Sequence, residues 1–161
     1  MTLEQEIGIS LRRQGLTIAT AESCTGGALA ARITSVPGSS AYFTGGIVAY
    51  SNVVKQSVLH VSPQTLEQQG AVSRQTVCEM AQGVMQLLHT DCAIATSGIA
   101  GPNGGTPDKP VGTVWIAVAY KNKIVTHLQS GDCGRVENVQ RTVQKALQIV
   151  SEVLKERENS N

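Results

Sequence analysis

Apolar and polar positions follow two periods along this chain, and the period switches several times between helical and extended. A first helix is predicted behind Thr2, which forms a capping-box pattern with Gln5, and it ends at Gly15. Residues 16–21 alternate and are rich in β-branched side chains, which predicts a short strand. Residues 28–33 return to helical spacing, so a strand, a polar turn and a helix follow one another directly.

The rest of the chain continues this interleaving. Three helices are predicted between residues 51 and 89, and each begins at a serine that can cap it: Ser51, Ser62 and Ser73. A long final helix follows from Arg135. The further predicted strands are 47–50, 91–97, 111–119 and 123–130.

This order of elements predicts one domain over residues 1–161. Helices and strands alternate without a repeat or a break in composition, so we expect a three-layer α/β/α sandwich around a mixed sheet, in the α/β class. Its core spans about residues 5–154. Residues 155–161 are expected to form a frayed tail.

Composition argues against several classes of protein. Of 161 residues, 41% are apolar and 16% are charged, as in a soluble globular domain. A net charge of +1 and an aromatic content of 3% give no support to a nucleic-acid partner. No stretch approaches the ~20 apolar residues of a membrane helix, and the first residues lack a signal-peptide pattern, so we expect no membrane contact and a cytoplasmic location. The four cysteines and three histidines are scattered, which indicates no metal site.

The strongest candidate for a binding element is the loop between the strands 91–97 and 111–119. It is long for a connection, since about 4–6 residues is typical, and it contains Gly98, Gly101, Gly104 and Gly105. Successive glycines allow backbone N–H groups to converge on anionic oxygens, and Ser97 stands where the first strand ends. Glycine and proline also simply punctuate loops, so both interpretations stay open.

A second candidate is the polar turn Glu22-Ser-Cys-Thr-Gly-Gly27 between the strand 16–21 and the helix 28–33. A strand, a small polar turn and a helix together aim a helix N-terminus at an anion. The alternative is a capped helix start that packs closely on the strand.

Several separated motifs together resemble one family. They are Thr20-Ala-Glu-Ser-Cys-Thr-Gly-Gly27, Tyr50-Ser-Asn with Lys55, Gly70-Ala-Val-Ser73, Ser97-Gly-Ile-Ala-Gly-Pro-Asn-Gly-Gly105, and Lys109-Pro-Val-Gly-Thr-Val-Trp115. In this order and spacing the chain resembles the C-terminal domain family of the competence/damage-inducible protein CinA, from about Gln5 to Leu154. Stand-alone members of that family include nicotinamide-nucleotide amidohydrolases.

The resemblance implies hydrolysis of the carboxamide of nicotinamide mononucleotide, which gives nicotinic acid mononucleotide and ammonia in pyridine nucleotide salvage. It implies a small-molecule pyridine mononucleotide as partner and no cofactor. It also implies a homodimer, for which the wide apolar stripe from Val136 to Leu154 offers a surface. That stripe can equally pack on the chain's own sheet.

The family pattern implies Ser40, Tyr50 and Lys55 as catalytic residues: a hydroxyl nucleophile with a lysine or tyrosine as proton acceptor. A lysine is a base only if its pKa falls well below ~10.4, through burial or a nearby cation. Without the family, Lys55 is more simply a solvated helix lysine and Ser40 a turn residue, like its neighbour Ser39.

The substrate-binding candidates lie in the two glycine-rich segments and near the start of the last helix. Glu22 is a poor neighbour for a phosphate, and we expect it to fix local backbone or to accept a ribose hydroxyl. The set comprises Glu22, Ser23, Thr25, Gly26, Gly27, Ser97, Gly98, Gly101, Gly104, Gly105, Arg135 and Arg141.

The chain departs from the family pattern in one place. Many members carry Gly-Asp-Arg with a further arginine about four residues later, whereas here the segment is Gly131-Asp-Cys-Gly-Arg135, and Arg141 is next. Six residues on a helix turn through roughly 600°, so the two arginines face different directions, and either is a candidate. The altered segment keeps a second hypothesis open: a ligand-binding or regulatory protein of the same fold that has lost turnover.

Overall fold

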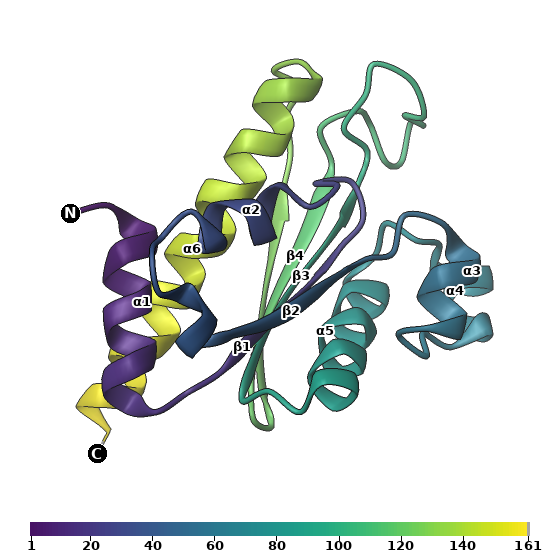
Figure 1. Ribbon diagram of the computed structural model, residues 1–161. Coiled ribbons are helices and arrows are strands. Elements are labelled where there is room, and N and C mark those ends of the chain that lie inside the picture. Colours follow the sequence, from purple (N-terminus) through teal and green to yellow (C-terminus); the bar gives the residue numbers. More distant parts are fainter. Residues whose placement is uncertain (161) are drawn as a thin grey trace.

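The computed structural model describes residues 1–160 as a five-stranded mixed sheet covered by helices on both faces (Figure 1), which confirms the predicted class of fold. The strand order is β2-β1-β3-β4-β5. Strands β2, β1 and β3 are parallel to one another, and β4 pairs antiparallel with both of its neighbours, β3 and β5. The strands are β1 (Ile18–Glu22), β2 (Phe43–Val48), β3 (Cys92–Gly98), β4 (Val114–Tyr120) and β5 (Lys123–Gln129). The helices are α1 (Leu3–Gln14), α2 (Ala28–Thr34), a 3₁₀ turn η1 (Ser39–Ala41), α3 (Asn52–Ser57), α4 (Pro63–Gln69), α5 (Arg74–Leu88) and α6 (Arg135–Asn159).

The helix ends follow from local chemistry. Thr2 and Gln5 form the predicted capping box at the start of α1, and Gly15 ends the helix in a left-handed conformation. Ser51 and Ser73 each accept a backbone N–H at the start of their helices, as predicted. Among the helices of residues 1–160, none has both the length and the apolar character needed to cross a membrane.

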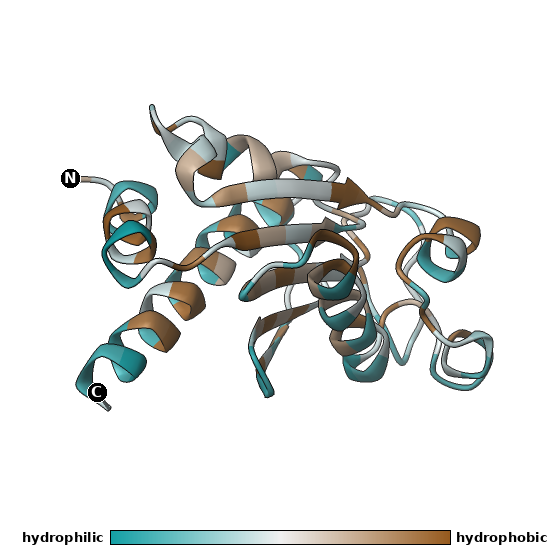
Figure 2. Cartoon of the chain, turned by 60° about the horizontal axis from the view of Figure 1, so that its bottom comes forward, coloured by the Kyte–Doolittle hydropathy of each residue, from teal (hydrophilic) through white to brown (hydrophobic). Residues whose placement is uncertain are grey.

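The two faces of the sheet carry different side chains, because successive strand residues point to opposite sides. Large residues such as Ile18, Ile94 and Ile116 pack under α1, α2 and α6. Alanines at the alternate positions of β1, β3 and β4, Ala19 and Ala93 among them, pack under α5. Figure 2 shows apolar residues gathered on the strands and on the inward stripes of the helices, with hydrophilic residues outward.

Close packing on the face of the sheet that carries the alanines fixes the position of α3 against α5. A Cβ on Gly83 of α5 would lie 2.0 Å from the backbone oxygen of Leu59, just after α3. The approach of these two segments therefore requires glycine.

We expect Gly83→Ala to lower the free energy of unfolding by about 1–3 kcal/mol, since backbone must shift to admit the methyl group. Denaturant unfolding measures this loss. Gln82→Ala, at the neighbouring exposed position of the same helix, is the control and should change stability little. Equal stability of Gly83→Ala and wild type would contradict the close contact.

One prediction about the last helix needs correction, and one open alternative is decided. Residues 155–159 are helical rather than frayed, because Glu156 pairs with Lys123 and Arg157 donates to the hydroxyl of Tyr120; Asn161 lies outside the described residues. The apolar stripe of α6 packs into the chain's own core apart from Val136, which is exposed. The homodimer thus remains a prediction from the family resemblance alone.

Candidate active site

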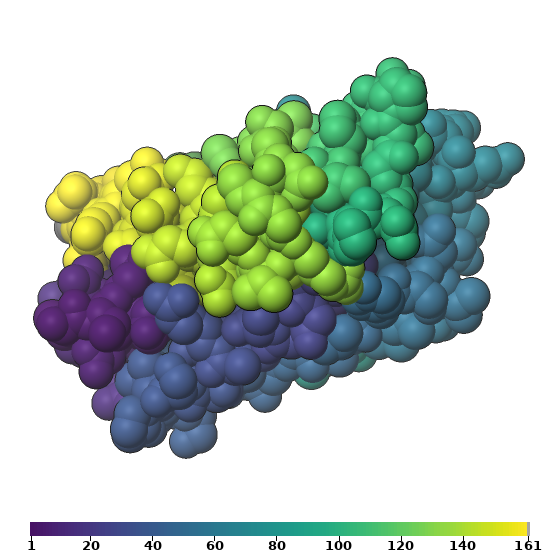
Figure 3. Space-filling view, turned by 90° about the horizontal axis from the view of Figure 1, so that it is seen from above, coloured from purple at the N-terminus to yellow at the C-terminus, as the bar shows by residue number. Residues whose placement is uncertain are grey.

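The carboxyl ends of the three parallel strands meet at one edge of the sheet, where ligands bind in open α/β sheets. Figure 3 looks onto this edge, where the loop 99–113 (green), the start of α6 (yellow-green) and the segment that contains α3 (blue) adjoin. A cavity of about 270 Å³ lies here. It is lined by Ser23, Cys24, Tyr50, Asn52, Lys55, Ala71, Val72, residues 97–101, Asn103, Gly104 and Arg135.

Ser23 faces this cavity because of its position after β1. Ala19 and Ala21 belong to the core under α5, and Ser23 continues their face of the strand. Its backbone N–H donates to Thr96 at 3.0 Å, so the residue stays in line with the sheet. The hydroxyl is thereby directed to the side on which α3 lies.

Lys55 of α3 meets that hydroxyl inside the protein. The side chain is only 1% exposed, and its Nζ lies 2.9 Å from Ser23 Oγ, 2.9 Å from the Ala49 oxygen and 3.2 Å from the Tyr50 oxygen. Two of the three neighbours are carbonyl oxygens, which only accept hydrogen bonds. A neutral amine has two hydrogens and one lone pair. Donation to both carbonyls therefore leaves its lone pair for the hydroxyl of Ser23.

The surroundings shift the protonation equilibrium of Lys55 toward that neutral amine. Burial lowers the pKa of Lys55 below its usual value of 10.5, with a smaller opposing effect from Cys24. Lys55 forms no ion pair with a carboxylate among residues 1–160. Of the two causes that can depress a lysine pKa, burial and a neighbouring cation, burial is the one that lowers the pKa of Lys55 here.

Cys24 follows Ser23 and also lines the cavity, which the sequence analysis did not anticipate. Burial raises the pKa of its thiol to about 12. A neutral thiol is a weak nucleophile, which argues against Cys24 as a reactive group of this turn.

The carboxylate of Glu22 points to the opposite face of the sheet. It accepts hydrogen bonds from the backbone N–H groups of Leu29 (2.8 Å) and Ala30 (3.0 Å) and from the hydroxyl of Thr25 (2.6 Å). Thr25 in turn lies 2.7 Å from the hydroxyl of Thr96. Of the two predicted roles for Glu22, fixing local backbone is the one that these contacts support. Neither Glu22, Thr25, Gly26 nor Gly27 lines the cavity.

Ser40 lies far from this site. It belongs to η1, which precedes Phe43 at the start of β2, and Phe43 pairs with Ile18 at the opposite end of β1. Strand β2 advances about 3.3 Å per residue, so its five steps alone separate the two ends by roughly 16 Å. The predicted meeting of Ser40 with Lys55 is therefore wrong in this structure, and the same holds for Ser39.

Other predicted residues do converge. The Ser97 hydroxyl donates to the Ala71 oxygen at 2.8 Å and fixes the segment before α5 against the end of β3. Arg135, at the start of α6, donates to the Tyr50 hydroxyl (3.1 Å) and to the Gly101 oxygen (2.7 Å), bridging three segments at the cavity.

Arg141 does not reach the cavity. It donates to the Gly131 oxygen and to Asn138 Oδ1 instead, which resolves the ambiguity between the two arginines in favour of Arg135. Gly98, Gly101 and Gly104 line the cavity, whereas Gly105 does not.

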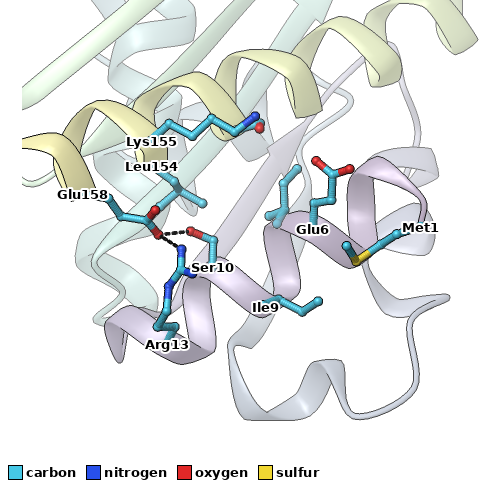
Figure 4. A pocket seen from close by; sticks show the side chains of 10 residues that line it. Met1, Glu6, Ile9, Ser10, Arg13, Leu154, Lys155 and Glu158 are labelled. Carbon is cyan, nitrogen blue, oxygen red and sulfur yellow. Dashed lines mark hydrogen bonds and ion pairs between the residues drawn. The ribbon is translucent and has the colours of Figure 1, made fainter.

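A second cavity, of about 200 Å³, lies between α1 and α6 (Figure 4). Here Glu158 forms an ion pair with Arg13 and accepts a hydrogen bond from Ser10 at 2.8 Å. Because the Glu158 carboxylate is paired with Arg13, it is not free to act as a base toward the Ser10 hydroxyl. Among residues 1–160, no group of three or more His, Cys, Asp or Glu side chains is arranged to hold a metal ion.

A family model for the CinA C-terminal domain matches residues 1–154. The chain belongs to the CinA C-terminal domain family. Solved structures from this family agree with the fold: the competence/damage inducible protein CihA from Agrobacterium tumefaciens is 41% identical with a TM-score of 0.91, over 95% of this chain and 93% of that chain. A CinA superfamily protein from Klebsiella pneumoniae is 38% identical with a TM-score of 0.90, over 96% of both chains.

Two curated relatives of the CinA C-terminal domain family bear on function. The nicotinamide-nucleotide amidohydrolase PncC of Shewanella oneidensis is 52% identical over 127 residues, 79% of this chain. A CinA-like protein of Cytophaga hutchinsonii is 48% identical over 156 residues, 96% of this chain. The chain spans 30% and 37% of the length of these two relatives.

Proposed function

We propose that this chain hydrolyses the carboxamide of nicotinamide mononucleotide, with Ser23 as nucleophile and Lys55 as its base. The observation that carries the proposal is the buried contact of 2.9 Å between Lys55 Nζ and Ser23 Oγ, beside two carbonyl oxygens that can accept the hydrogens of a neutral amine. The name of the Shewanella oneidensis relative supports the choice of substrate. Ser23 thus replaces Ser40 in the serine/lysine mechanism that the family resemblance implied.

In the first half-reaction, Ser23 Oγ attacks the carboxamide carbon while Lys55 takes the hydroxyl proton. The tetrahedral intermediate collapses with cleavage of the C–N bond, and the Lys55 ammonium gives its proton to the departing nitrogen, which leaves as ammonia. A nicotinoyl ester on Ser23 remains. Water then attacks this ester with Lys55 as base, and Ser23 regains its proton as nicotinic acid mononucleotide leaves.

The oxyanion of the intermediate needs hydrogen-bond donors. Among residues 1–160, the backbone N–H groups of Cys24 and Thr25 donate to no protein acceptor, and they directly follow the nucleophile. The N–H after a nucleophilic serine commonly serves this purpose. We assign these two groups to the oxyanion.

The charge around the cavity suits an anionic substrate. Arg135 lies at its edge and forms no ion pair among the described residues. Glu22 adjoins Ser23 in the sequence, but backbone N–H groups hold its carboxylate on the other face of the sheet. We therefore assign the phosphate of the mononucleotide to Arg135 and to the glycine-rich loop 98–104.

Ammonia release from nicotinamide mononucleotide by the purified protein tests the proposal directly. Stoichiometric ammonia and nicotinic acid mononucleotide are the expected result. Binding of the nucleotide without ammonia would favour the alternative, a ligand-binding protein of the same fold.

We expect kcat/KM to rise with pH along a limb set by the lowered pKa of Lys55, because only the neutral amine accepts a proton. The same shift affects stability. At pH values between the lowered pKa of Lys55 in the folded protein and its pKa of ~10.4 in the unfolded chain, the unfolded chain binds more protons. The contribution of Lys55 to stability is therefore full above ~10.4 and is lost as pH falls through the folded pKa. A pH–rate profile and unfolding at several pH values measure both effects. A rate that is flat or falls as pH rises toward 10 would contradict a lysine base.

A further inference from the structure

Asn138 is a buried polar side chain on the second turn of α6, and it does not itself line the cavity. It is 0% exposed, yet its amide group is fully hydrogen-bonded. Nδ2 donates to the Ala100 oxygen at 3.0 Å and to Asp132 Oδ1 at 2.9 Å. Oδ1 accepts from the Cys133 backbone N–H at 2.8 Å and from Arg141 at 3.0 Å. One side chain therefore joins three segments.

These contacts connect the start of α6 with the loop that lines the cavity. Asn138 holds Ala100, and Arg135, one turn earlier on the same helix, holds Gly101. Two adjacent carbonyl groups of the loop are thus tied to two side chains of one helix face. The helix and this part of the loop are placed as one unit.

The start of α6 depends on Asn138 for a second reason. Gly134, which precedes the helix, provides no side-chain cap. Asn138 reaches back to the N–H of Cys133 instead, and Asp132, itself bonded to Asn138, accepts the N–H of Gly134 at 2.9 Å. Without the amide of Asn138, the turn that carries Arg135 loses this internal support.

We propose that Asn138 is a positioning residue that holds Arg135 and the Ala100–Gly101 segment against the cavity and thereby sets affinity for the anionic end of the substrate. This inference rests on the proposed function, in which Arg135 receives the phosphate. Asn138 itself acts only through Arg135 and the loop.

The test compares Asn138→Leu with Thr142→Val. Thr142 is also 0% exposed on α6, and its hydroxyl donates to the Asn138 backbone oxygen at 2.8 Å, within the helix. The control therefore removes a buried hydrogen bond from the same helix without touching the loop. We expect Asn138→Leu to raise KM for nicotinamide mononucleotide roughly 10-fold with a smaller change in kcat, and Thr142→Val to leave KM nearly unchanged.

A double variant distinguishes positioning from general loss of structure. In an Arg135→Gln background, Asn138→Leu should raise KM by a clearly smaller factor than in the wild-type background, because one of the two groups that Asn138 positions is gone. If the increases in KM caused by Asn138→Leu and by Arg135→Gln simply multiplied in the double variant, the proposal would be overturned. Equal effects of Asn138→Leu and Thr142→Val would also overturn it.

Amide hydrogen exchange keeps this inference separate from the proposed reaction, since it needs no substrate. In the ligand-free protein, exchange at residues 99–105 should be faster in Asn138→Leu than in wild type, and unchanged in Thr142→Val. Unchanged exchange in Asn138→Leu would overturn the positioning role. Absence of ammonia release with the expected exchange pattern would instead refute the amidohydrolase and leave the positioning of the loop intact.

Discussion

Ser23→Ala is expected to lower kcat for hydrolysis of nicotinamide mononucleotide by at least about 10³-fold, the largest effect of any single substitution considered for this chain. The hydroxyl forms the covalent ester in the proposed mechanism, and no other side-chain hydroxyl lies within hydrogen-bond distance of Lys55 Nζ among the described residues. Affinity should change little, because the substrate is held by the glycine-rich loop and Arg135. Steady-state kinetics and a binding measurement on the same variant separate the two.

Ser40→Ala and Ser39→Ala are the matched controls. Both serines lie in η1 at the far end of β2, so either substitution should retain close to wild-type kcat. A nearly inactive Ser40→Ala protein with wild-type rates for Ser23→Ala would refute the assignment of the nucleophile.

Lys55→Met should lower kcat by roughly 10²–10⁴-fold, the range that general-base assistance commonly provides. Methionine approximates the length of the lysine side chain without a proton acceptor. Combined with Ser23→Ala it should cost little more than either change alone, because both disable one step. Lys123→Met, which removes an exposed lysine paired with Glu156, is the control and should not alter kcat.

Two outcomes would contradict this role for Lys55. Additive losses in the double variant would mean that the serine and the lysine serve separate steps. A pH–rate limb that persists in Lys55→Met would assign the titrating group to another residue.

Much of the fold follows from local patterns in the sequence. The capping box at Thr2 and the caps Ser51 and Ser73 are each determined by a few neighbouring residues, and each was predicted, whereas the predicted cap Ser62 makes no side-chain hydrogen bond to its helix start. The layered architecture follows from the order of strands and helices. Strand ends were less accurate, and β4 begins at Val114 rather than at residue 111.

The family pattern implied Ser40 as the nucleophile, and the strand pattern did not correct this choice. The predicted strand spanned residues 47–50, whereas β2 runs through Gly45 and Gly46 from Phe43 to Val48. A Cβ on Gly46 would lie 2.3 Å from the hydroxyl of Thr20, so the glycine serves close packing between strands rather than a turn. Because β2 starts at Phe43, Ser40 lies at the end of the sheet opposite the cavity.

Ser23 was within reach of sequence reasoning. The alternation that buries Ala19 and Ala21 beneath α5 continues to Ser23 and predicts its side. The choice of Arg135 over Arg141 was not predictable, since it depends on where α6 begins and on the contacts of Asn138, which joins segments distant in sequence.

Adjacent residues of β1 serve opposite layers of the molecule, Glu22 the start of α2 and Ser23 the amine of Lys55. The thickness of one sheet thus keeps a carboxylate away from the amine that the proposed mechanism requires to be uncharged. The arrangement depends on the alternation of side chains along β1. A single residue inserted into the strand would exchange the faces to which Glu22 and Ser23 point. Glu22 would then meet Lys55 as a buried ion pair with no free lone pair, and the start of α2 would lose its carboxylate. A reactive centre would become an inert structural contact without the loss of any of its residues.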